Sequence, residues 1–171
     1  MSFRIGMRKI KSLISLVVAF FIWQLIRFIM PGLEPHPIFA YIYSVMEIRA
    51  TADETKKFGK LRIKATFIGL LTAIFFITLS VFTVAKIEAN MWRLLAEVLV
   101  ILIATLISLI FAEKAKCESF CGIAAMITIM CLVSHGEEDI YLHAIMRVCQ
   151  TLIGVFSALI VNILVKNDKK D

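Results

Sequence analysis

Four long stretches of the chain are almost entirely apolar, and they dominate its pattern of hydrophobic and polar positions. They cover residues 13–30, 65–85, 94–112 and 146–165. A helix of about 20 mostly apolar residues is long enough to cross the hydrocarbon core of a bilayer, which is roughly 30 Å thick. Each stretch therefore predicts a membrane-spanning α-helix.

Two shorter apolar stretches, 37–46 and 119–134, are ambiguous by length alone. A segment of this size can be re-entrant, interfacial or a tightly enclosed span. Counting both as spans predicts an all-α integral membrane bundle of six transmembrane segments, two of them short. The polar stretches between them are too short for a soluble domain, so we expect residues 1–171 to form a single transmembrane domain.

The two halves of the chain resemble each other. From Arg62 to Arg147 the separation is 85 residues, and the same separation relates four further identical pairs: Thr66 and Thr151, Ile68 and Ile153, Gly69 and Gly154, and Ala73 and Ala158. The repeat predicts halves of about 8–85 and 93–167. Each half has three spans, an odd number, so the second copy must be inverted in the membrane. Inverted repeats are typical of transporters.

Composition and charge agree with a membrane location. Hydrophobic residues make up 60% of the chain, against about 45–50% in soluble proteins. If all six segments cross, most of the 19 lysines and arginines fall on one side, in the clusters 4–11, 49–64, 114–116 and 166–170. Basic loops face the cytoplasm, so we expect both termini to be cytoplasmic in a cell (inner or plasma) membrane.

The net charge of +6 is explained by basic flanks facing anionic lipid, and we expect no nucleic-acid partner. Cys117 and Cys121 are one helical turn apart, but no clustered histidines or carboxylates complete a metal site. The spans contain no nucleophile motif, and no nucleotide-binding loop occurs. We therefore expect neither an enzyme nor a cofactor.

Polar residues in the apolar segments are the candidates for substrate binding. Arg147 can bind a carboxylate through its guanidinium group, or it can anchor the helix at the membrane interface. Gln150 and the matched Thr66 and Thr151 can line a cavity or bond between helices. Tyr41 and Tyr43, in the second segment, can contact an aromatic ring. These six residues are the predicted substrate site.

Glu97 is the candidate coupling residue, because ionisable groups within spans are costly and often functional. The alternative is a local pair with Arg93, four residues earlier on the same helix. A separate set of small residues predicts close helix packing. This set consists of Gly69, Ala73, Gly154 and Ala158, and we expect it to join the third and sixth helices.

Three segments together resemble a known family. They are the pattern R-x-x-x-T-x-I-G-x-x-x-A in the third span, PIFA at 37–40, and RVCQTLIGVFSALIVN at 147–162. They are similar to the aromatic acid exporter family, within the fusaric-acid-resistance-type inner-membrane proteins. The resemblance implies a six-helix membrane module that exports aromatic carboxylic acids and is often followed by a cytoplasmic domain. We expect that domain to be missing here, and a separate soluble subunit could supply it.

The sequence thus predicts a secondary exporter of small aromatic organic anions. Its expected partners are the lipid bilayer, the anion and further copies of the chain. The alternative is a non-transporting membrane scaffold or assembly subunit, since small-residue packing faces suit both classes.

Overall fold

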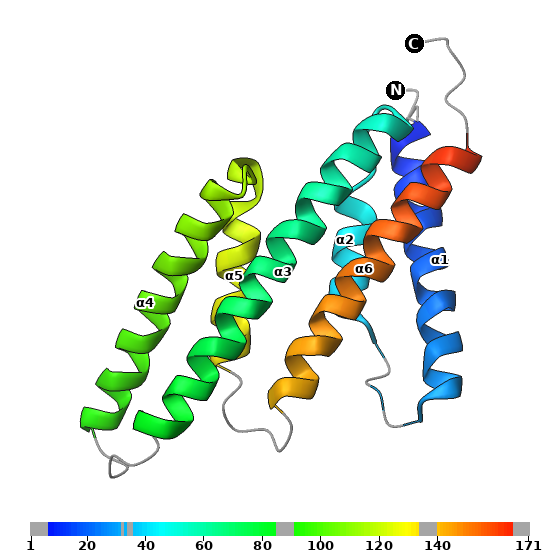
Figure 1. Ribbon diagram of the computed structural model, residues 1–171. Coiled ribbons are helices and arrows are strands. Elements are labelled where there is room, and N and C mark those ends of the chain that lie inside the picture. The colour runs from blue at the N-terminus through cyan, green and yellow to red at the C-terminus, as the bar shows by residue number, and fades with distance from the viewer. Residues whose placement is uncertain (1–6, 32, 34–35, 85–90, 134–139, 166–171) are drawn as a thin grey trace, which may run out of the picture. The chain divides into compact units, whose positions relative to one another are not determined.

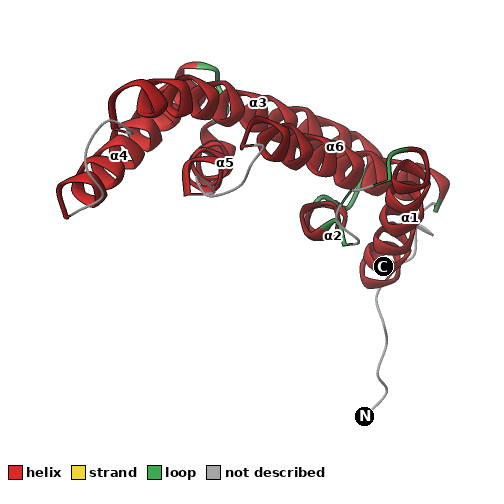
Figure 2. Cartoon of the chain, turned by 90° about the horizontal axis from the view of Figure 1, so that it is seen from below, coloured by secondary structure: helices red, strands yellow, loops and turns green. Residues whose placement is uncertain are grey.

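The computed structural model describes residues 7–31, 33, 36–84, 91–133 and 140–165, and their regular structure is entirely helical (Figure 2). The helices are α1 (Met7–Ile29), α2 (Ile38–Met46), α3 (Ala52–Thr83), α4 (Met91–Lys114), α5 (Cys121–Val133) and α6 (Ile140–Leu164), with a 3₁₀ turn, η2 (Glu118–Phe120), before α5 (Figure 1). The predicted all-α membrane bundle is confirmed. The basic cluster at 166–170, which enters the charge argument, lies outside the described residues.

Helices α1, α3, α4 and α6 are long and apolar enough to cross a membrane. Helix α3 has 32 residues and is about 48 Å long, so it is longer than the hydrocarbon core is thick. It begins in the polar sequence that precedes the apolar stretch at 65–85. Its start is capped by Thr51, whose Oγ1 accepts a hydrogen bond from the backbone N–H of Glu54 at 3.2 Å. Asp53 and Glu54 in the first turn further favour this helix end.

The two short apolar stretches also form helices, as predicted. Helix α2 has 9 residues and α5 has 13, which correspond to about 14 Å and about 20 Å. Neither length alone spans a core of roughly 30 Å. Complete crossing by α2 and α5 therefore stays a prediction.

The chain divides into two compact units that do not follow the sequence halves. Unit 1 comprises residues 1–60 and 149–171, and unit 2 comprises residues 61–148. Unit 1 thus contains α1, α2, the start of α3 and most of α6. Unit 2 contains most of α3 together with α4, α5 and the start of α6. Each unit takes most of its third helix from the opposite half of the repeat.

In unit 1, helix α1 packs against α2 and buries a single stripe of side chains. The stripe consists of Lys11, Ser15, Ala19 and Trp23, which lie on one face because they are four residues apart. Helix α6 approaches α2 at Gly154. A Cβ atom there would lie 2.7 Å from the carbonyl oxygen of Ala40 and 2.8 Å from Cβ of Tyr43, so only glycine fits.

In unit 2, helix α4 packs against α5 and buries only small side chains, those of Ala104, Ser108 and Ala112. Helix α3 meets α5 at Gly69, where a Cβ atom would lie 2.5 Å from the carbonyl oxygen of Ala124. Thr128 reinforces this contact, because its hydroxyl donates a hydrogen bond to the carbonyl oxygen of Gly69 at 3.1 Å. The second long helix–short helix contact thus also depends on a glycine. The expectation that Gly69 and Gly154 join the third and sixth helices is therefore wrong, since each glycine meets a short helix instead.

Candidate functional site

A lysine is buried inside unit 1, one turn after the start of α1. Lys11 is 2% exposed, and its ammonium group donates a hydrogen bond to Oδ1 of Asn162 on α6 at 2.8 Å. A buried charge in a membrane helix is costly unless it is compensated, so such residues are functional candidates by default. Lys11 is therefore the centre of the candidate site.

Asn162 connects this lysine to the segment between α2 and α3. Its Nδ2 atom donates to the carbonyl oxygens of Arg49 at 3.2 Å and Thr51 at 3.0 Å, and to Oγ1 of Thr55 at 2.8 Å. All three partners accept hydrogen bonds in these contacts, which fixes the orientation of the amide, with Oδ1 toward Lys11. The amide therefore links α1, α6 and the start of α3 at one end of unit 1.

The positive charge of Lys11 is only partly balanced by its surroundings. Among the described residues Lys11 forms no ion pair, and its acceptor on Asn162 is neutral. Asn162 lies in the last turn of α6, where the carbonyl groups carry a partial negative charge that favours a cation. That partial charge is about half of an elementary charge, so an anion would add favourable energy here.

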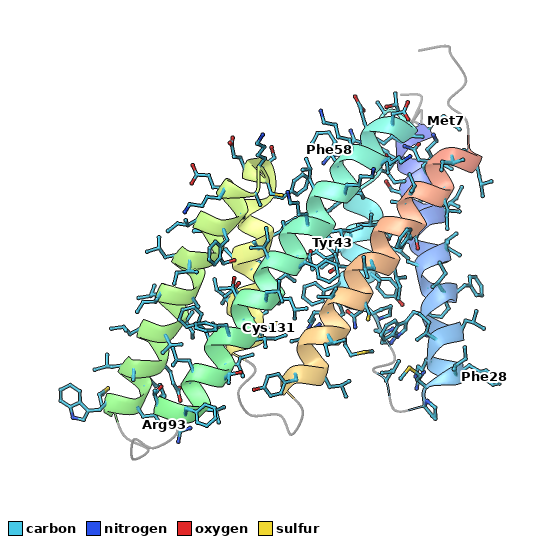
Figure 3. All side chains as sticks on the ribbon, viewed as in Figure 1. Met7, Phe28, Tyr43, Phe58, Arg93 and Cys131 are labelled. Carbon is cyan, nitrogen blue, oxygen red and sulfur yellow. The ribbon has the colours of Figure 1, made fainter. Side chains whose placement is uncertain are left out.

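The predicted site residues of unit 1 gather around α2. Gln150 is buried, and its Oε1 atom accepts a hydrogen bond of 3.4 Å from the backbone N–H of Phe39, in the first turn of α2. Tyr43, labelled in Figure 3, is buried as well. Its ring centroid is 6.1 Å from that of Phe39. Thr151 is buried and Tyr41 is half-buried. Gln150 thus helps to satisfy the free N–H groups at the start of α2.

The remaining predicted substrate residues, Thr66 and Arg147, belong to unit 2. Thr66 is buried, and its hydroxyl has no hydrogen-bond partner among the described residues. Arg147 is half-buried. In the same unit Arg62 is buried on α3, with its guanidinium carbon 5.4 Å from the centroid of the Phe120 ring, a cation–π contact.

Glu97 lies on α4 beside a pocket of about 270 Å³ that Ser80 and Leu132 also line. Its Oε1 atom is 3.1 Å from Nε of Arg93, and the two side chains are 39% and 41% exposed. Arg93 lies near the start of the helix (Figure 3). The local pair that the sequence offered as an alternative is therefore present, and it adjoins a cavity.

Sequence reasoning missed Lys11 and Thr55. Lys11 was counted with the basic cluster at 4–11, because a lysine near the start of a span normally extends to the interface. The available signal was its spacing from Ser15 and Ala19, since these three residues repeat every four positions along one helix face. The described residues contain no group of three or more His, Cys, Asp or Glu side chains placed to hold a metal ion.

A family model described as aromatic acid exporter family member 1 matches residues 3–165, nearly the whole chain. No curated protein and no solved structure gives a significant match.

Proposed function

Since the chain belongs to the family described as aromatic acid exporter family member 1, we propose that it is a secondary exporter of small aromatic organic anions. It resides in the cell membrane with both termini in the cytoplasm. Export is driven by the proton gradient or by the membrane potential. The observation that supports this function best is the buried ammonium group of Lys11, held by Asn162 at one end of unit 1.

The chemistry of an aromatic carboxylate fits this interior. Moving such an anion into a low-dielectric region requires a cation to balance its charge, and Lys11 offers one close to the cytoplasmic end of α1 in the proposed orientation. The aromatic ring requires apolar or aromatic surface, which Tyr41 and Tyr43 provide on α2. Gln150 and Thr151 add polar groups within the same unit.

Three residues of unit 2 complete the proposal. Arg147 and Thr66 are candidates for contacting the anion at another stage of transport, and Glu97 is the candidate for proton coupling. The pocket beside Glu97 gives protons access to its carboxylate, because the side chain is partly exposed.

Flux in proteoliposomes tests the proposal. Purified protein would be reconstituted, and transport of radiolabelled benzoate under an imposed pH gradient would be compared with transport of neutral benzamide. We expect gradient-dependent benzoate flux that Arg147→Ala reduces and Arg147→Lys partly retains. Correctly folded protein that moves no aromatic carboxylate would contradict the proposal and favour the scaffold alternative.

We also propose that copies of the chain associate through α4. Its lipid-facing surface includes the exposed residues Leu95, Leu99, Leu102 and Leu106, whose spacing is that of helices packed side by side. Native mass spectrometry of Leu99→Ala combined with Leu102→Ala tests this, and we expect a smaller assembly than in the wild type. An unchanged assembly would exclude α4 as the interface, and a soluble subunit would then be sought by co-purification.

A further inference from the structure

Ser15 lies one turn after Lys11 on the buried face of α1. It is 0% exposed, yet its hydroxyl has no hydrogen-bond partner among the described residues. A serine inside a helix commonly bonds to the carbonyl group four residues earlier, as Ser157 does on α6 with Ile153 at 2.7 Å. A buried hydroxyl without a partner is costly, so Ser15 has an unused hydrogen-bond donor beside the lysine.

Lys11 has unused donors as well. An ammonium group has three N–H donors, and in the described part of the chain its only hydrogen bond is the one to Asn162. Residues four apart on a helix have Cβ atoms about 5–6 Å from each other. Because Lys11 has a flexible four-carbon stem, its ammonium group can turn toward Ser15 once it leaves Asn162, and a carboxylate between them can then accept a hydrogen bond from each.

We propose that Lys11 and Ser15 form the carboxylate-binding locus of the exporter, with Lys11 balancing the charge and Ser15 donating a second hydrogen bond. This inference rests on the proposed function and names the site within it. Both side chains are buried, so an anion reaches them when the bond between Lys11 and Asn162 opens. The carboxylate then replaces the neutral amide oxygen as the acceptor of Lys11.

The rest of the same stripe indicates the class of substrate. Ala19 and Trp23 follow Ser15 at intervals of four residues, and both are buried. From Ser15 to Trp23 the helix rises about 12 Å, which accommodates a benzene ring between the carboxylate and the indole. Ala19 is fully buried, so the ring enters only when the packing against this face of α1 opens, and it can then pair favourably with the indole. The stripe therefore favours a monocarboxylate attached to one aromatic ring.

Tryptophan fluorescence tests this inference by direct binding. The chain has two tryptophans, and Trp92 is 72% exposed on α4, so Trp92→Phe leaves Trp23 as the reporter. The probe is 4-nitrobenzoate, whose nitroaromatic ring quenches indole fluorescence, and neutral 4-nitrobenzamide serves as the control. We expect saturable quenching by the acid. Its dissociation constant should rise at least tenfold in Lys11→Met and about threefold in Ser15→Ala, corresponding to the loss of a charged and a neutral hydrogen bond.

Lys9→Met is the matched control, because Lys9 is exposed on the same helix, and we expect unchanged affinity. Wild-type affinity in Lys11→Met, or equal quenching by the acid and the amide, would overturn the inference. If Lys11→Met does not fold, the affinity of Ser15→Ala tests the inference, because that substitution removes only one oxygen atom. Wild-type affinity in Ser15→Ala would also overturn the inference. Saturable, Lys11-dependent quenching without benzoate flux would reject the exporter function while the binding site stands. Benzoate flux that does not depend on Lys11 would reject only the site.

Discussion

In both units a long helix reaches a short helix through a glycine. Gly154 of α6 lies against Ala40 of α2 in unit 1, and Gly69 of α3 lies against Ala124 of α5 in unit 2. The two glycines are matched by the separation of 85 residues, and the residues that they touch are matched to within one position. The repeated glycine thus has the same packing role in the two units.

Both units bury polar residues, Arg62 and Thr66 among them in unit 2, but several of those in unit 1 have apolar counterparts in the repeat. Unit 1 buries Lys11, Glu47, Gln150 and Asn162. At the same separation the other half of the sequence has Ala96, Leu132, Ala65 and Ile77, respectively. The backbone packing is therefore compatible with either interior, and the polar residues of unit 1 are not needed to build it. This difference is the reason for proposing that the anion is recognised in unit 1.

Asn162→Leu should have the largest effect on stability. It removes the acceptor of Lys11 and leaves a buried ammonium group without a hydrogen bond, which should cost at least about 3 kcal/mol because the group is charged. Adding Lys11→Met should recover most of the lost free energy of unfolding, because positions 11 and 162 are then both apolar, like the matched Ala96 and Ile77. The free energy of unfolding in mixed micelles measures both variants, and additive losses would contradict the comparison.

Gly69→Ala and Gly154→Ala should each destabilise the protein by about 1–3 kcal/mol, because the new methyl group would overlap a backbone carbonyl oxygen. Gly122 of α5 is the control, since a Cβ atom there meets nothing within 4 Å. Gly122→Ala should be neutral or stabilising by about 0.5–1 kcal/mol. Thermal unfolding compares the three variants, and a loss confined to one of the two matched glycines would show that they are not equivalent.

Lys116→Gly should stabilise unit 2 by about 1 kcal/mol. Lys116 follows α4 with a φ of 60°, a conformation that favours glycine. The adjacent N–H of Cys117 bonds to the carbonyl oxygen of Ala112 at 2.9 Å, which completes a Schellman-type helix end. The midpoint of thermal unfolding should rise, and a lower midpoint would mean that the lysine side chain contributes more than its backbone costs.

Glu97→Gln should have the smallest effect on stability, no more than about 0.5 kcal/mol, because it breaks a partly exposed pair one turn long. Its effect on transport should be larger if Glu97 couples protons to export. We expect benzoate flux to lose its dependence on the pH gradient while exchange of benzoate without a gradient continues. Flux that still follows the gradient would leave Glu97 as a structural residue of unit 2.

Hydrophobic pattern alone predicted the helices, because apolar runs between polar turns specify spans directly. The short α2 and α5 were found in the same way, and the repeat identified Gly69 and Gly154 as positions of close approach. The expectation that these glycines join the third and sixth helices was wrong, because Gly69 meets α5 and Gly154 meets α2. The helix that each glycine meets depends on the tertiary arrangement, in which each unit takes most of its third helix from the other half of the sequence. A local sequence pattern does not specify that arrangement.

The candidate site was harder to predict than the fold. Gln150 was recognised as a polar residue at depth, but its contact with the start of α2 requires knowledge of a partner more than 100 positions away in sequence. Lys11 could not be distinguished from the neighbouring surface lysines, since residue type does not show whether an ammonium group is buried or lies at the interface. Only the contact with Asn162 makes the difference visible.

The most direct test of unit 1 as the anion-recognising unit is benzoate flux in proteoliposomes containing Lys11→Met, with Lys11→Arg and Lys9→Met measured alongside. We predict that Lys11→Met lowers the initial rate at least tenfold, that Lys11→Arg retains part of it because the charge is kept, and that Lys9→Met matches the wild type. A folded Lys11→Met protein that transports benzoate at the wild-type rate would contradict this role of unit 1.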